Sequence, residues 1–260
     1  MAVTIAIKCH EGIVLAADTR ISLEVKNNNQ SFFKNFDSTK KLLNLGGEHS
    51  HIGILNSGVF SIKKKLIASY LPELIHEIGE EALPNVFAYA QAVYNFFQNQ
   101  WDKEIPIDYN GPELSFVVAG FDRGDFDAKL YTFNIPFHNT IKEVFEGNMT
   151  CGIHYGGDSW IINRLIRGFD QRVLEDNNSL RDLPKELRQK LIKEIEVKST
   201  IQFPFDIYSL EDAIKLANTL ISTSIDIGEL SLTPSGNGGQ IIVAVIKYDE
   251  DMDFVQGDLI

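Results

Sequence analysis

The segment that decides the fold is AVTIAIKCHEGIVLAADTR, residues 2–20. In residues 2–9 the apolar side chains alternate, and this period of two is typical of a β-strand. Residues 13–18, IVLAAD, form a second apolar run after the pair Glu11-Gly12, where a turn is expected. The segment therefore predicts a buried β-hairpin at the beginning of the sequence, where chain ends usually fray.

Composition and charge narrow the class of protein. The chain has 260 residues, is 44% hydrophobic and carries a net charge of −12, which argues against nucleic-acid binding because nothing offsets phosphate repulsion. No run approaches the roughly 20 apolar residues that cross a bilayer. The opening segment contains charged residues and lacks a small-residue cleavage pattern, unlike a signal peptide. Cys9 and Cys151 stand far apart, which fits a reduced, cytoplasmic setting.

The rest of the chain is organised in blocks of strands and blocks of helices. Residues 22–38 are polar and asparagine-rich, and we expect a loop or an irregular arm there. Strands are expected at 40–45, 51–57, 113–121, 128–135, near 141–151 and at 239–248. Helices are expected at 59–78 with a break at Pro72, at 84–103, after Asp158 or Ser159, and at 209–222.

This order predicts an α+β fold, because strands and helices come in separate blocks and not in strict alternation. No composition shift marks a linker, so residues 1–260 are expected to form one domain. Residues 175–206 are charged and have the character of an insertion. They contain the amphipathic stretch PKELRQKLIKEI, which is either a solvated surface helix or a subunit contact.

Four stretches together resemble a proteasome β-type subunit, a member of the N-terminal nucleophile hydrolases. They are the opening hairpin, TKKLLNL (39–45), ILNSGV (54–59) and GGQIIVAVI (238–246). The acidic residue and serine in YGGDSW (155–160) are most similar to the bacterial relatives called ancestral β-subunits. The resemblance implies a four-layer αββα sandwich, and it offers no counterpart for residues 175–206.

The family's chemistry explains a hairpin at the chain's end. Its mature chain begins with a threonine whose hydroxyl attacks the peptide carbonyl, while the α-amine of the same residue takes the proton. An α-amine has a pKa of about 7.7–8.0, close to the pH at which a general base works best. A lysine tunes that amine, a carboxylate holds the lysine, and a backbone N–H stabilises the oxyanion.

The resemblance transfers these roles to individual positions. Asp18 matches the family acid, Lys41 the lysine and Gly58 the oxyanion-hole glycine. Arg20 and Ser22 match substrate-side positions, Ser159 matches a supporting serine, and Asp226 is the candidate for a supporting acid. Asn237, in SGNGG, stands where the family usually has serine.

The departure from the family lies at the nucleophile. Counted back from Asp18, the family threonine falls on Ala2, and removal of Met1 would leave a free amine without a hydroxyl. Thr4 is an alternative nucleophile, because it lies on the same face of the strand as Ala2. It would shift the site by about 7 Å along the strand, away from Lys41 and Gly58. Cys9 points to the opposite face and is expected to be a buried apolar residue.

Three functions follow from the resemblance. The first is a threonine-type peptidase that lacks its nucleophile because Ala2, natural or engineered, replaces threonine. The second is a non-catalytic structural or regulatory ring subunit, and the third is a hydrolase of other amides. The retained Asp18, Lys41 and Gly58 favour the first. Its chemistry requires no metal or organic cofactor, its substrate would be a peptide or unfolded protein, and self-association into rings or stacked arrays is expected. The sequence does not indicate an ATPase partner.

Overall fold

The computed structural model describes residues 3–27, 30–147, 150–175, 180, 182–232 and 236–257. Ala2, the predicted nucleophile position, lies outside these residues. Contacts divide the chain into two compact units: Met1–Asp158 with Phe205–Ile260, and Ser159–Pro204. The single domain over 1–260 with an insertion at 175–206 stays a prediction.

The first sheet of the larger unit is built on the opening hairpin. Its strand order is β12-β1-β2-β13-β14, with β1 (Val3–Cys9), β2 (Gly12–Asp18), β12 (Gly152–Gly157), β13 (Ile241–Ile246) and β14 (Asp253–Gln256). Neighbouring strands are antiparallel, and Cys9 pairs with Gly12 across the turn. Every residue of β1 and β2 is buried. The predicted hairpin is confirmed, and both of its faces are covered.

The second sheet supplies the face against which the hairpin packs. Its order is β11-β10-β9-β6-β5, with β5 (Leu42–Asn44), β6 (Gly53–Gly58), β9 (Leu114–Phe121), β10 (Ala128–Ile135) and β11 (His138–Glu143). The predicted strand pair at 40–45 and 51–57 is confirmed as β5 and β6. The strand expected near 141–151 is confirmed only at its beginning, because β11 ends at Glu143 and the next strand, β12, begins at Gly152.

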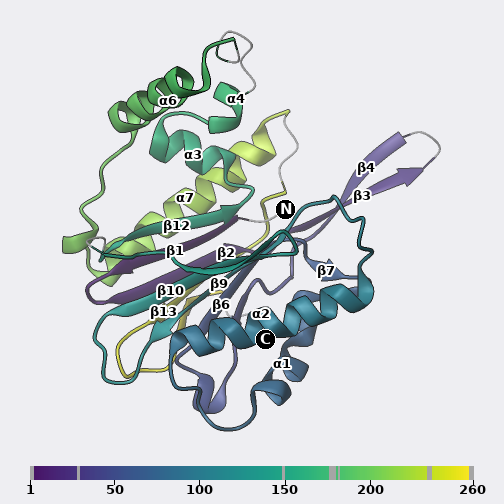
Figure 1. The fold of residues 1–260 in the computed structure, drawn as a ribbon, viewed down its shortest axis with the longest axis vertical. Coiled ribbons are helices and arrows are strands. Elements are labelled where there is room, and N and C mark those ends of the chain that lie inside the picture. The colour runs from purple at the N-terminus through teal and green to yellow at the C-terminus, as the bar shows by residue number, and fades with distance from the viewer. Residues whose placement is uncertain are drawn as a thin grey trace. The chain divides into compact units, whose positions relative to one another are not determined.

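Helices cover the outer faces of both sheets (Figure 1). Helix α7 (Leu210–Leu230) contacts β1, β2 and β13, and α2 (Val86–Glu104) contacts β9 and β10. β1 and β2 contact β6 from the other sheet. Apolar side chains fill the space between the sheets and the space between α2 and the second sheet. Helix α7, which contacts the first sheet, buries Ala213, Ala217 and Ile221. The predicted Ser209 caps α7 together with Asp212, whereas α2 is capped by Asn85 and begins at Val86, after the Pro84 that was expected in its first turn.

One prediction of local structure is wrong, and another is confirmed only in part. The polar segment 22–38 forms an antiparallel ribbon of β3 (Ile21–Asn27) and β4 (Gln30–Phe36), because backbone pairing does not require apolar side chains. The helix expected over 59–78 is confirmed only in its second half, as the 3₁₀-helix η2 (Ile67–Tyr70) and α1 (Leu71–Ile78), whereas the first half forms the short strands β7 (Ser61–Ile62) and β8 (Lys65–Leu66). Pro72 lies in the first turn of α1, where its missing N–H costs nothing.

The smaller unit, residues 159–204, is helical. It contains α3 (Trp160–Arg167), α4 (Gln171–Glu175) and α6 (Lys185–Ser199), and the last confirms the helix expected in the amphipathic stretch. The Ser199 hydroxyl donates to the Arg167 carbonyl at 2.5 Å, which ties the end of α6 to the end of α3. The remaining helical turns are η1 (Gly47–His49) and η3 (Phe205–Ile207), both in the larger unit. Among the residues that the structure describes, no helix has the length and apolar character of a membrane span.

Phe97 at the centre of the α2 layer provides a test of this packing. Its ring is 1% exposed and stacks on Phe116 at 4.7 Å between centroids. We expect Phe97→Ala to lower the free energy of unfolding by about 3–5 kcal/mol, because it leaves a cavity. Phe87→Ala is the matched control, since Phe87 lies on the same helix and is 43% exposed. Urea denaturation of both variants checks this, and equal losses would contradict the assigned core.

Candidate active site

The candidate site is centred on the Asp18 carboxylate, at the last residue of β2. The side chain is fully buried, and its Oδ1 accepts hydrogen bonds from the Val3 backbone N–H at 2.9 Å and from Lys41 Nζ at 2.8 Å. Its Oδ2 accepts from the N–H groups of Gly238 at 2.9 Å and Arg20 at 3.3 Å. One carboxylate therefore gathers donors from the beginning of β1, the residue before β5 and the loop before β13.

Lys41 is held as tightly as its partner. Its Nζ also donates to the Arg20 carbonyl at 2.5 Å, and only 3% of the side chain is exposed. Burial raises the pKa of Asp18, against the lowering effect of Lys41 and of the N–H donors. Burial also lowers the pKa of Lys41, against the attraction of Asp18. The four donors on the carboxylate favour its charged form, and burial makes the lysine easier to deprotonate than in water.

Gly58 lies near Lys41 because β6 pairs with β5. The Asn56 N–H donates to the Lys41 carbonyl at 2.9 Å, and Lys41, Ser57 and Gly58 line one small hollow. Gly58 has a φ of 82°, and a Cβ there would lie 2.0 Å from the Glu113 carbonyl oxygen, so only glycine fits. The structure thus brings together three of the predicted catalytic positions, Asp18, Lys41 and Gly58.

The predicted substrate-side residues have protein partners. The Arg20 guanidinium pairs with Asp37 at 2.7 Å and with Glu229 at 3.0 Å. The Ser22 hydroxyl donates to Asn35 Oδ1 at 2.8 Å across the β3–β4 ribbon. The Arg20 side chain therefore fixes the loop that carries the Lys41 acceptor, and its role in substrate binding stays a prediction.

The roles of the two predicted supporting residues stay predictions. Ser159 is the first residue of the smaller unit and occupies the N-cap position of α3 without a side-chain cap. Asp226 is exposed on α7. The acid of α7 that reaches the site region is Glu229, through its ion pair with Arg20. Asp226 lies three positions before Glu229 on the same helix, and its role as a supporting acid stays a prediction.

Asp158 and Thr19 are two further polar residues near the site. Asp158 was named from the sequence, in YGGDSW and as a possible helix start, whereas Thr19 was not named. Asp158 is 5% exposed, and its Oδ2 accepts from the Gly236 N–H at 3.2 Å while its carbonyl accepts from Asn237 Nδ2 at 2.9 Å. Thr19 Oγ1 accepts from the Gln240 N–H at 2.8 Å. Together they hold the glycine-rich segment beside Asp18. The sequence motif YGGDSW contains Asp158, which directly precedes the predicted supporting residue Ser159.

A polar cavity of about 380 Å³ lies between the sheets next to this site. Thr4 and Ser57 line it from opposite sheets, and a Cβ on Gly156 would be 3.3 Å and 3.4 Å from their hydroxyl oxygens. His154 lines it from β12, and burial lowers the pKa of its imidazole. Thr4 therefore faces the second sheet and is 3% exposed.

The fold has relatives among solved structures. Anbu, the ancestral β-subunit, from Yersinia bercovieri matches with a TM-score of 0.55 and 13% identity over 98% of this chain and 88% of that one. A Gly-1 mutant of Anbu from Hyphomicrobium sp. strain MC1 matches with a TM-score of 0.54 and 13% identity over 98% and 86%. No protein-family model and no curated protein matches the sequence. The chain therefore shares the fold of Anbu at low sequence identity.

Removing Lys41 should make stability depend on pH in a defined direction. In Lys41→Met the buried Asp18 loses its counter-ion, so its folded-state pKa rises further above the unfolded value of about 3.9. The folded state then binds more protons, and stability is lost as the pH rises through the folded pKa. We expect unfolding to cost about 3–5 kcal/mol less than in the parent near pH 8, with a smaller deficit near pH 5.

Urea denaturation at both pH values measures this difference. The control is Lys247→Met, which removes an exposed lysine paired with Glu250. It should show no comparable pH dependence. A Lys41→Met deficit that is the same near pH 5 and pH 8 would contradict the assignment of a buried ion pair.

Proposed function

We propose that this chain is a proteasome-related subunit whose site is arranged for peptide hydrolysis by an N-terminal nucleophile, with Ala2 at the nucleophile position. The layers formed by α7, the two sheets and α2 correspond in this proposal to the αββα sandwich of that hydrolase class. One observation carries it. The Val3 N–H and Lys41 Nζ donate to the same oxygen of Asp18, and the Val3 nitrogen is bonded to residue 2.

The chemistry follows from that adjacency. A hydroxyl at residue 2 would attack the scissile carbonyl, and its proton would pass to the α-amine of the same residue. The Lys41 ammonium favours the unprotonated amine, and Asp18 positions the lysine. Gly58 N–H would stabilise the oxyanion. The C–N bond then breaks, the leaving amine takes the proton, and water hydrolyses the ester. Ala2 supplies the amine and no hydroxyl, so the chain with Ala2 is inert in this reaction.

The second candidate is a non-catalytic subunit of the same assembly. Ala2 itself favours it, because the residue removes the attacking atom. The two candidates differ in one respect that can be measured: whether the site catalyses hydrolysis when the hydroxyl is present.

Restoring the hydroxyl tests the proposal. We expect Ala2→Thr to cleave fluorogenic peptide amides about a hundredfold faster or more than the Ala2 chain, since loss of a nucleophile removes most of a covalent mechanism. Ala2→Val is the matched control, because valine has the shape of threonine without the hydroxyl. Mass spectrometry of the intact chain verifies that residue 2 is the first residue in both variants.

The outcomes separate the two candidates. If Ala2→Thr is folded, begins at residue 2 and is no faster than Ala2→Val on peptides of varied sequence, the non-catalytic subunit stands. If both variants cleave equally, the attacking group is not at position 2 and the proposed mechanism is wrong.

We further infer that the β3–β4 ribbon contacts a second copy of the chain. Figure 1 shows the ribbon extending away from the two stacked sheets. Phe32 and Phe33 are 50% and 57% exposed, and successive residues of a strand point to opposite faces. An isolated two-stranded ribbon is marginally stable in water. Rings or stacked arrays would cover both faces with neighbouring subunits.

Sedimentation velocity tests this assembly. We expect Phe32→Ser with Phe33→Ser to lower the average mass of the particles, because two apolar contacts are lost at each interface. The control is Phe126→Ser with Phe137→Ser, which changes two other exposed phenylalanines (75% and 52%) outside the ribbon. A monomeric parent chain, or equal effects of both pairs, would contradict the inference.

A further inference from the structure

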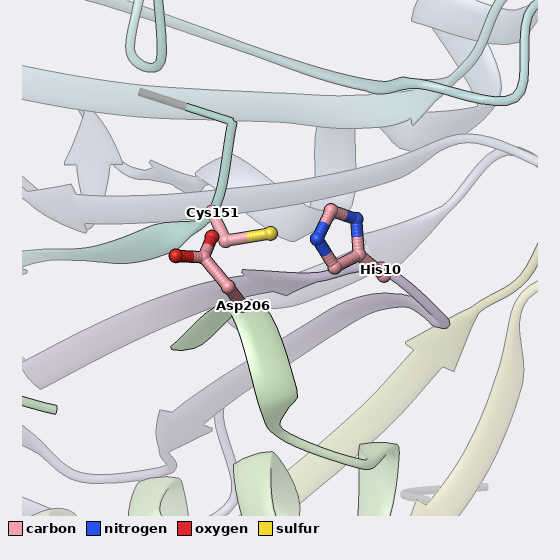
Figure 2. Close-up of side chains that lie close together, drawn as sticks. All are labelled: His10, Cys151 and Asp206. Atoms are coloured by element: carbon pink, nitrogen blue, oxygen red, sulfur yellow. The ribbon is translucent and has the colours of Figure 1, made fainter. Parts of the chain in front are cut away.

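Three side chains that the candidate site does not use come together at the far end of β1. They are His10, Cys151 and Asp206 (Figure 2), and their ligand atoms all lie within 4.8 Å of one another. The seven residues of β1 separate His10 from the Asp18 site by roughly 20 Å, at about 3.3 Å per residue. The cluster is therefore independent of the proposed hydrolytic chemistry.

The fold fixes each member of the cluster. His10 lies in the turn between β1 and β2, and Cys151 directly precedes β12, which pairs with β1 through Lys8 and Gly152. Asp206 lies in η3, which contacts β1. The same turn is also bound to the beginning of α7, because the Leu210 N–H donates to the Glu11 carboxylate at 2.9 Å. The three segments are thus held together by contacts other than the cluster itself.

We propose that His10, Cys151 and Asp206 bind a zinc ion. A thiolate, an imidazole and a carboxylate are the three protein ligand types that Zn²⁺ accepts in tetrahedral sites. Zinc–ligand bonds of about 2.0–2.3 Å place tetrahedral ligand atoms about 3.3–3.8 Å apart. The observed limit of 4.8 Å therefore requires only small side-chain rotations.

Burial divides the roles of the three ligands. Cys151 is 9% exposed and anchors the ion, whereas His10 and Asp206 are exposed and free to turn toward it. Figure 2 shows the thiol and the imidazole pointing toward each other, with the carboxylate beside the thiol. The positive charge of Lys8 reaches Cys151, and the ion pair of its Nζ with Asp127 at 2.7 Å offsets part of that charge. A water molecule would complete the coordination of the ion. The bound ion would link the β1–β2 turn to η3, the segment that precedes α7.

Cobalt titration of the full chain, stripped with a chelator, tests the site. If Co²⁺ binds to the same three ligands in tetrahedral geometry, it gives a thiolate charge-transfer band and strong visible absorption bands. Added Zn²⁺ then displaces the Co²⁺ and removes these bands. We expect Cys151→Ser to abolish the charge-transfer band and His10→Ala or Asp206→Asn to weaken binding at least about tenfold. Cys9→Ala is the matched control, since Cys9 is the other buried thiol and precedes His10.

A second measurement uses the unmodified chain, so that a folding defect in a variant does not decide the result. Zn²⁺ should slow alkylation of Cys151 by iodoacetamide relative to Cys9, read by peptide mass spectrometry. It should also raise the Tm by about 5 °C or more at a hundredfold excess over the Kd. A cobalt complex without a thiolate band, a band lost in Cys9→Ala, or Cys151 alkylation unchanged by zinc would overturn the proposal.

Discussion

The buried pair of Asp18 and Lys41 determines how the ends of four segments meet in the larger unit. Asp18 accepts from Val3, Gly238 and Arg20 as well as from Lys41, and Val3, Lys41 and Gly238 belong to segments far apart in the sequence. A buried carboxylate without donors costs several kcal/mol, so each donor segment must reach it. The beginning of β1, the end of β2 and the loop before β13 therefore converge on one point.

Close backbone approach around this pair explains the glycines of the site. A Cβ on Gly58 would overlap the Glu113 carbonyl, and a Cβ on Gly238 would lie 2.1 Å from the Arg20 guanidinium carbon. Arg20 in turn is fixed by Asp37 and Glu229, so its carbonyl stays in place to accept from Lys41. The buried pair of Asp18 and Lys41 and the loops that carry Arg20 and Gly238 thus hold each other in place, so that a change in either affects both.

The sequence predicted the parts of the structure that depend on local pattern. The opening hairpin, α2 and α7 follow from periodicity and capping residues, and Asp18, Lys41 and Gly58 follow from a family resemblance. The β3–β4 ribbon was missed because the asparagines around position 28 outweighed the alternation of Ile21, Leu23 and Val25, which is typical of a strand. Glu229 was missed because a helix offers several acids, and only packing selects the one that reaches Arg20. The cluster of His10, Cys151 and Asp206 was missed because its members meet only through sheet pairing and the return of the chain at η3.

The hydrogen-bonded frame beside position 2 consists of Asp18, Lys41 and their hydrogen-bond partners. This frame does not depend on the side chain at position 2. The four donors on Asp18 and the two acceptors of Lys41 are all supplied by other residues, so alanine in place of threonine leaves every one of these bonds intact. Folding alone therefore maintains the arrangement, since breaking the buried pair would leave an uncompensated charge. It follows that an intact frame and an active site are separate properties here. The frame requires the packing of the sheets, whereas the proposed hydrolysis would also require one oxygen atom at the residue bonded to Val3.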